Sequence, residues 1–66
     1  MQIHLDTFRA FDIRPGDVVI YPGTRRLVRV DRVEHGKDYA DQVTMYFWDG
    51  NAMSAVGDAR IPAFRA

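Results

Sequence analysis

Three side chains of the types that dominate protein interfaces lie in two segments with the alternation of a β-strand. Arg29 lies in segment 27–33, and Tyr46 and Trp48 lie in segment 43–48. The apolar positions that alternate with them are Val28, Val30, Val43, Met45 and Phe47. If those apolar residues face a core, alternation turns Arg29, Tyr46 and Trp48 outward. These residue types are enriched at interface hot spots, so the sequence predicts a partner-binding surface there.

The opposite register of the same strands predicts a purely structural role for the two aromatic residues. A shift of one residue exchanges the two faces of a strand, which would bury Tyr46 and Trp48 in the core. The exposure of these two side chains therefore decides between a surface role and a core role.

Four arginines in one stretch favour a different chemistry. They are Arg25, Arg26, Arg29 and Arg32. With stacking aromatic side chains on a barrel surface, they suit a single-stranded nucleic acid. Acidic residues between positions 17 and 41 can neutralise them, and a regular strand would place Arg26 and Arg32 on the face opposite Arg25 and Arg29. Nucleic-acid binding is therefore the alternative prediction.

The residue types that perform catalysis or bind metals are few and poorly spaced. The two histidines, His4 and His35, are far apart in sequence, whereas a metal site needs three or four converging ligands. Ser54 lies in an expected strand, and the pair Asp38 and Asp41 lies in a polar loop where aspartate favours turns. The glycines occur singly and form no phosphate-binding loop. We therefore predict no catalytic, cofactor-binding or metal-binding residues and no enzyme.

Composition and charge limit the class of protein. Sixty-six residues allow one small domain over residues 1–66, in which residues 1–12 can form an N-terminal extension. The chain is 47% hydrophobic, too apolar for a disordered tail, and its nine basic and nine acidic residues cancel, which disfavours a histone-like or membrane-surface protein. No apolar run approaches the ~18 residues of a membrane span, and the first residues do not resemble a signal peptide. With no cysteine, these features favour a cytoplasmic protein without a membrane partner.

Turn-forming pairs divide the chain into short strands. Pro15-Gly16 and Pro22-Gly23 suit type II turns, and Asp49-Gly50 suits a two-residue type I′ hairpin. The segments between them with strand-like composition are 18–21, 27–33, 43–48 and 52–56, with 61–64 as a last edge strand. Residues 1–12 suit a short extended piece followed by a turn. Four to five short antiparallel strands predict an all-β fold, a small SH3-like barrel.

The apolar C-terminal region has two interpretations. Its residues are Met53, Ala55, Val56, Ile61 and Phe64. In the first interpretation they close the barrel. In the second the barrel closes without them, and they expose an apolar edge suited to a partner strand or to a second copy of the chain.

The start of the expected barrel resembles known families. The run Ile13-Arg14-Pro15-Gly16-Asp17-Val18-Val19-Ile20-Tyr21-Pro22 is similar to the first strand of small SH3-like barrels such as KOW and Tudor-like modules, which often follows a Pro-Gly-Asp or Gly-Asp turn. Its part from Gly16 to Pro22 resembles the CarD-type RNA-polymerase-interacting domain, although Gly23-Thr24-Arg25-Arg26 stands where that family has a histidine-glycine element. The resemblance implies a Tudor-like barrel and a transcription accessory role in which a barrel edge binds RNA polymerase.

These features predict a non-catalytic interaction module. It would bind another protein, or a second copy of itself, through the surface around Arg29, Tyr46 and Trp48 or through an edge strand. Two alternatives come from other classes. One is a small nucleic-acid-binding barrel, and the other is a structural subunit of a larger phage or plasmid-encoded assembly.

Overall fold

The computed structural model describes residues 6–21 and 23–65, which are nearly all strands and turns. The strands are β1 (Asp6–Arg9), β2 (Val18–Ile20), β3 (Leu27–His35), β4 (Gln42–Phe47), β5 (Ala52–Val56) and β6 (Arg60–Phe64), and a 3-10 turn covers Ala10–Asp12. The all-β prediction is confirmed, with six strands instead of four to five. The additional strand is β1, and the 3-10 turn follows it as expected. The described ranges contain no helix long and apolar enough to cross a membrane.

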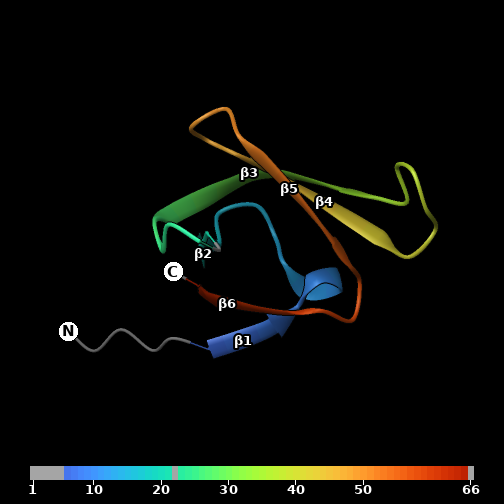
Figure 1. The fold of residues 1–66 in the computed structure, drawn as a ribbon, viewed down its shortest axis with the longest axis horizontal. Coiled ribbons are helices and arrows are strands. Elements are labelled where there is room, and N and C mark those ends of the chain that lie inside the picture. The colour runs from blue at the N-terminus through green and yellow to red at the C-terminus, as the bar shows by residue number, and fades with distance from the viewer. Residues whose placement is uncertain (1–5, 22, 66) are drawn as a thin grey trace.

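The strands form one antiparallel sheet in the order β1-β6-β2-β3-β4-β5. In Figure 1, β3, β4 and β5 lie in the upper part of the molecule, and β1 and β6 lie in the lower part. β6 pairs with β1 on one side and with β2 on the other, so the prediction of residues 61–64 as an edge strand is wrong. The reason is that residues 6–9 of β1 occupy the outer side of β6. Residues 6–9 of segment 1–12 are therefore part of the sheet.

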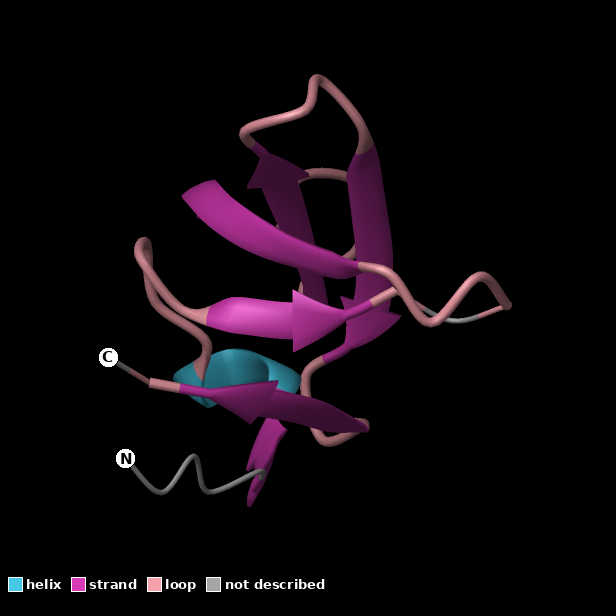
Figure 2. Ribbon diagram, turned by 90° about the vertical axis from the view of Figure 1, so that its left-hand side faces the viewer, coloured by secondary structure: helices cyan, strands magenta, loops and turns pink. Residues whose placement is uncertain are grey.

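A β-bulge in β3 bends the sheet. β3 pairs with β2 through Leu27, Val28 and Arg29, and with β4 from Val30 onward. The register with β4 shifts between Val30 and Arg32, which leaves Asp31 as the extra residue. A bulge bends its strand and increases the local twist, and Figure 2 shows the sheet as a curled layer. The curl lets the two halves of the sheet share one core.

The core lies inside the curled sheet. The apolar residues of one of the two alternating faces are all buried, with at most 6% exposure: Val28, Val30, Val43, Met45 and Phe47. The structure thereby decides between the two faces that the sequence left open. The other buried apolar residues are Ala10, Ile13, Val19, Ile61 and Ala63. In the C-terminal region Ile61 is buried, whereas Val56 is 58% exposed, so this region closes the core only in part.

The first Pro-Gly turn surrounds a buried carboxylate. Gly16 has a φ of 95°, and the Asp17 N–H donates to the Arg14 carbonyl oxygen at 3.1 Å, as expected for a type II turn. The Asp17 carboxylate, 2% exposed, accepts hydrogen bonds from the Arg14 N–H at 2.8 Å and from both Nε and Nη2 of Arg65 at 2.9 Å. This two-point contact ties the C-terminal segment to the start of β2. At the second Pro-Gly pair Gly23 has a φ of 88°, and Pro22 lies outside the described residues.

The turn between β4 and β5 differs from the expected hairpin. The Gly50 N–H donates to the Phe47 carbonyl oxygen at 3.1 Å, and the Phe47 N–H donates to the Asn51 carbonyl oxygen at 2.9 Å. The connection is therefore a three-residue loop, and the prediction of a two-residue type I′ hairpin is wrong. A type I′ turn needs a positive φ at both central residues, but at this loop only Gly50, with a φ of 92°, has one.

Candidate functional site

Arg29, Tyr46 and Trp48 lie on the side of the β3–β4 pair that faces away from the core, which we call the outer face. Trp48 follows β4 directly, and its N–H donates to the Arg29 carbonyl oxygen at 3.0 Å, so the two residues are neighbours across the strands. Tyr46 lies in β4 two residues before Trp48, which belongs to the turn that follows the strand. Trp48 is 70% exposed and Tyr46 is partly buried. Neither aromatic residue is a core residue.

The bulge in β3 adds Arg32 to the outer face. In a regular strand Arg32 would lie opposite Arg29, but the extra residue Asp31 reverses the alternation and pairs Arg32 with Tyr46. The Arg32 guanidinium lies over the Tyr46 ring, with Cζ 4.1 Å from the ring centroid. The expectation that Arg32 and Arg29 lie on opposite faces is therefore wrong. It failed because it assumed a regular strand.

The Tyr46 side chain already binds two cations of the same chain. Besides Arg32, the Lys37 Nζ donates to the Tyr46 hydroxyl at 2.9 Å, and this hydrogen bond is the main reason that the pKa of Lys37 is raised. Arg32 also pairs with Glu34 at 3.3 Å. Each exposed cation–π contact contributes about 0.5–1 kcal/mol. Tyr46 therefore positions charges on the outer face, and Arg32 covers one face of its ring. Sequence reasoning missed Lys37, because nothing in the spacing marks this loop residue.

Trp48 is the accessible aromatic side chain of the outer face. Within residues 6–21 and 23–65, its ring takes part in no aromatic or cation–π contact. In the same part of the chain, its neighbour Arg29 has no carboxylate within 4.0 Å. An exposed indole beside an unpaired guanidinium has the composition of an interface hot spot.

The four arginines predicted to contact nucleic acid are distributed over different surfaces. Arg25 lies in the β2–β3 loop and lines a groove with residues of β5 and β6. Arg26 lines another, smaller pocket. Arg29 and Arg32 share the outer face, where Arg32 is engaged by Glu34 and Tyr46. Binding of a single strand uses a continuous positive groove with accessible rings, and this distribution does not favour it.

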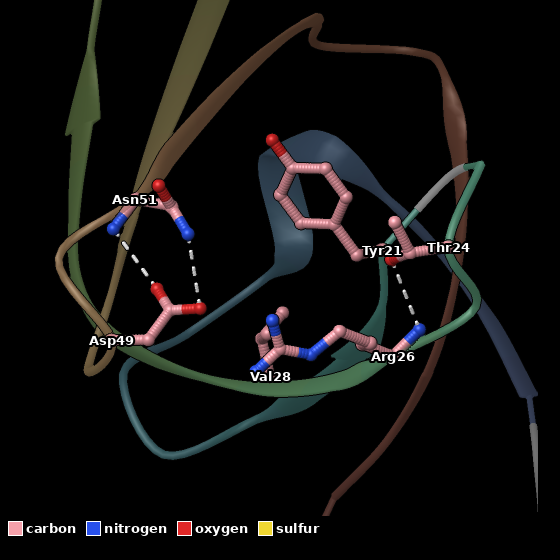
Figure 3. A pocket seen from close by; sticks show the side chains of 6 residues that line it. All are labelled: Tyr21, Thr24, Arg26, Val28, Asp49 and Asn51. Carbon is pink, nitrogen blue, oxygen red and sulfur yellow. Dashed lines mark hydrogen bonds between the residues drawn. The ribbon is translucent and has the colours of Figure 1, made fainter.

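The smaller pocket lies between the β2–β3 and β4–β5 loops (Figure 3) and has a volume of about 130 Å³. On one side Asp49 accepts hydrogen bonds from the Asn51 N–H at 2.9 Å and from Asn51 Nδ2 at 3.2 Å. The backbone hydrogen bond is the main reason that the pKa of Asp49 is lowered, and the nearby Arg26 lowers it further. Figure 3 shows Tyr21 over the pocket and the Arg26 side chain extending beneath it. The volume is below the roughly 300–1,000 Å³ of typical ligand pockets, so this site is too small for most organic ligands.

The residues considered for catalysis or metal binding have structural contacts. His35 stacks on Phe11 with the ring centroids 6.1 Å apart, and a Cβ on Gly57 would lie 2.1 Å from Cζ of the same phenyl ring. The Ser54 and Thr44 hydroxyl oxygens are hydrogen-bonded at 2.9 Å. His4 lies outside the described residues. The described residues contain no group of three or more histidine or acidic side chains that could hold a metal ion.

No protein-family model, curated protein or solved structure matches the chain.

Proposed function

We propose that this protein is a non-catalytic interaction module whose outer face binds a partner protein, with Trp48 and Arg29 at the centre of the contact. The observation that carries the proposal is the 70% exposure of the Trp48 side chain. A tryptophan in an interface buries roughly 150–250 Å² and supplies this area at a small cost in conformational entropy. An indole held in solvent by a folded hairpin is therefore available to a partner.

The surroundings of Trp48 favour a partner with acidic groups. Arg29, Arg32 and Lys37 lie on or beside the outer face, and Tyr46 holds two of these cations in place. Only Arg32 among the three is in an ion pair with a described carboxylate. Guanidinium groups bind carboxylates through two parallel hydrogen bonds, which adds specificity. Arg29 is the residue in position to do so next to Trp48.

The finer fold and family assignments are part of the same proposal. We assign the curled sheet to the SH3-like barrels, because β6 returns beside β2, the strand that follows the Pro-Gly-Asp turn. The resemblance of residues 16–22 to the CarD-type domain makes bacterial RNA polymerase a partner worth testing directly. The lack of cysteine is compatible with a cytoplasmic location for such a partnership.

A selection of random short peptides against the pure protein tests the outer face. We expect Trp48→Ala to weaken the selected peptides about tenfold or more, as is usual for a tryptophan hot spot. Tyr39→Ala is the matched control, because Tyr39 is an exposed aromatic residue of a different surface, with 71% exposure. Since Trp48 is the only tryptophan, its fluorescence should also shift to shorter wavelength when a peptide or RNA polymerase covers it.

Sedimentation at low and high salt, alone and with a mixed-sequence single-stranded oligonucleotide, separates the remaining partners. Self-association that Trp48→Ala abolishes would identify a second copy as the partner protein. An oligonucleotide complex that weakens steeply with salt would overturn the proposal in favour of nucleic-acid binding. Peptide affinities equal for Trp48→Ala and the wild type would contradict the assigned surface.

A further inference from the structure

A groove of about 490 Å³ separates β5 from the first half of β6, on a different surface from the outer face. In Figure 1 the two strands diverge from the short connection that joins them. Its apolar lining includes Ile20, Met53, Ala55 and Ile61, and its charged lining consists of Arg25 and Arg60. The volume is in the range of typical ligand pockets, roughly 300–1,000 Å³.

Pro62 explains why the sheet is open at this point. β2 pairs with β6 through Val18↔Phe64 and Val19↔Ala63, and the same register would place Ile20 opposite Pro62. A proline has no N–H to donate to a ladder, so pairing ends there and the strands separate. The opening is thus a consequence of the sequence of β6.

Among the strands that the structure describes, none pairs with the backbone groups of Ser54 or Arg60 that face the groove. In antiparallel pairs, residues with hydrogen bonds toward the neighbour alternate with residues whose groups point away. The Phe47 N–H donates to the Asn51 carbonyl oxygen, so the backbone groups of Asn51 point toward β4. Ser54 is three residues further along the chain, and alternation therefore points its backbone N–H and C=O away from β4. The Ala10 N–H donates to the Ala59 carbonyl oxygen, so the carbonyl group of Ala59 points toward the side of β1. The backbone N–H and C=O of Arg60, the next residue, therefore point away from β1. Among the described strands, none pairs with β5 on this side.

The charge of the groove is positive. Within residues 6–21 and 23–65, no acidic residue lines it, and neither Arg25 nor Arg60 has a carboxylate within 4.0 Å. Arg25 adopts a left-handed φ of 57°, the one such non-glycine residue among those described. Strained backbone of this kind is concentrated at functional sites. Arg25 lies in the β2–β3 loop and Arg60 begins β6, so both charged side chains of the lining are arginines from elements other than β5.

We propose that this groove binds an extended segment of a partner protein that adds a strand to the edge of β5. Its apolar side chains would enter the groove, and acidic residues flanking them would pair with Arg25 and Arg60. Main-chain hydrogen bonds supply affinity in such strand addition, and the pockets for side chains supply specificity. The inference rests on the proposed role in protein binding, but it concerns another surface, so the two proposals can fail separately.

Fluorescence anisotropy with synthetic peptides tests the proposal. The probe alternates valine and threonine and carries glutamates at both ends, and the control peptide carries lysines in their place. We expect the lysine peptide to bind about tenfold more weakly or worse. We also expect Arg25→Gln with Arg60→Gln to weaken the glutamate peptide about tenfold or more, because both charge contacts are lost.

Arg14→Gln with Arg26→Gln is the matched control, since it removes the same charge at positions that do not line the groove and should leave binding unchanged. Ser54→Pro removes an N–H from the open edge of β5 and should weaken both the wild-type and the arginine-variant complexes. Circular dichroism verifies the folding of each variant, and the surface arginine variants keep the test valid if Ser54→Pro does not fold. Equal affinity for the two peptides, or equal loss in the two arginine pairs, would overturn the proposal.

Two further outcomes would assign the groove to another occupant and also overturn the proposal. One is a dimer in sedimentation that Arg25→Gln with Arg60→Gln dissociates. The other is an oligonucleotide that displaces the glutamate peptide from the wild-type protein. Loss of peptide binding in Trp48→Ala would instead place the probe on the outer face.

Discussion

At the scale of single residues, Asp17 is the charged side chain that is buried among the residues the structure describes. Burial disfavours its ionised form, but hydrogen bonds from Arg65 and from the Arg14 backbone outweigh this effect and lower the pKa of Asp17 below its ordinary value of 3.8. A carboxyl group with a lowered pKa stabilises the fold at pH values above the unfolded pKa. This stabilisation is lost as the pH falls through the lowered pKa.

We expect Asp17→Asn to reduce the free energy of unfolding at pH 7 by about 1–3 kcal/mol, because the hydrogen bonds to a charged acceptor are replaced by weaker ones. The upper part of this range is disfavoured, since the Arg65 side chain is 37% exposed and solvent screens its charge. The difference between wild type and variant should shrink as the pH falls below 3.8. Urea unfolding at a series of pH values measures it.

Asp58→Asn is the control for this prediction. The Asp58 side chain is 81% exposed and lies 3.9 Å from Arg9, so its loss should change stability by less than about 0.5 kcal/mol. Equal effects of the two substitutions, or a constant difference down to the lowest pH, would show that the Asp17 contact does not act as described.

At the scale of elements, two irregularities in the strands create the two candidate binding surfaces. The bulge at Asp31 brings Arg32 to Tyr46 on the outer face. Pro62 ends the ladder between β2 and β6 and opens the groove. In both cases a local departure from a regular strand changes which side chains share a surface.

We expect Pro62→Ala to extend the ladder between β2 and β6 by one residue. The new N–H would donate to the Ile20 carbonyl oxygen, because the register places these residues opposite each other. One hydrogen bond raises the free energy of unfolding by about 0.5–1.5 kcal/mol. Replacing the proline also gives the unfolded chain more conformational freedom, which lowers the free energy of unfolding by about 0.4–1 kcal/mol. Overall stability should therefore change little, while the amide at position 62 becomes protected from hydrogen exchange in NMR.

The amide of Arg60 is an internal control in the same NMR experiment. Its groups point into the groove, so it should exchange rapidly in both proteins. Rapid exchange at position 62 would mean that something other than the missing N–H keeps the strands apart.

At the scale of the whole molecule, a chain of this length has a small core and little stability to spare. Met45 lies at its centre, is 0% exposed and belongs to β4, between β3 and β5. Any loss of volume there affects both halves of the curled sheet.

We expect Met45→Ala to cost about 2–5 kcal/mol and to lower the melting temperature by at least about 10 °C, or to unfold the protein. Leu27→Ala, at a position that is 59% exposed, should change it by only a few degrees. Thermal unfolding followed by circular dichroism measures both. Similar melting temperatures of the two variants would contradict the assignment of the core.

The all-β class could be predicted from sequence, because turn residues and alternation are local properties. Alternation groups the residues of the two central strands into two faces, but only the tertiary structure decides which face points inward. The exposure of Trp48 also depends on the fold, because this residue lies in the turn that follows β4. The places of β1 and β6 in the sheet, the bulge at Asp31 and the cations on Tyr46 depend on pairing between residues distant in the chain. The groove between β5 and β6 has the same origin, since a proline interrupts a ladder only when a particular strand lies beside it. Tertiary structure alone decides which strand that is.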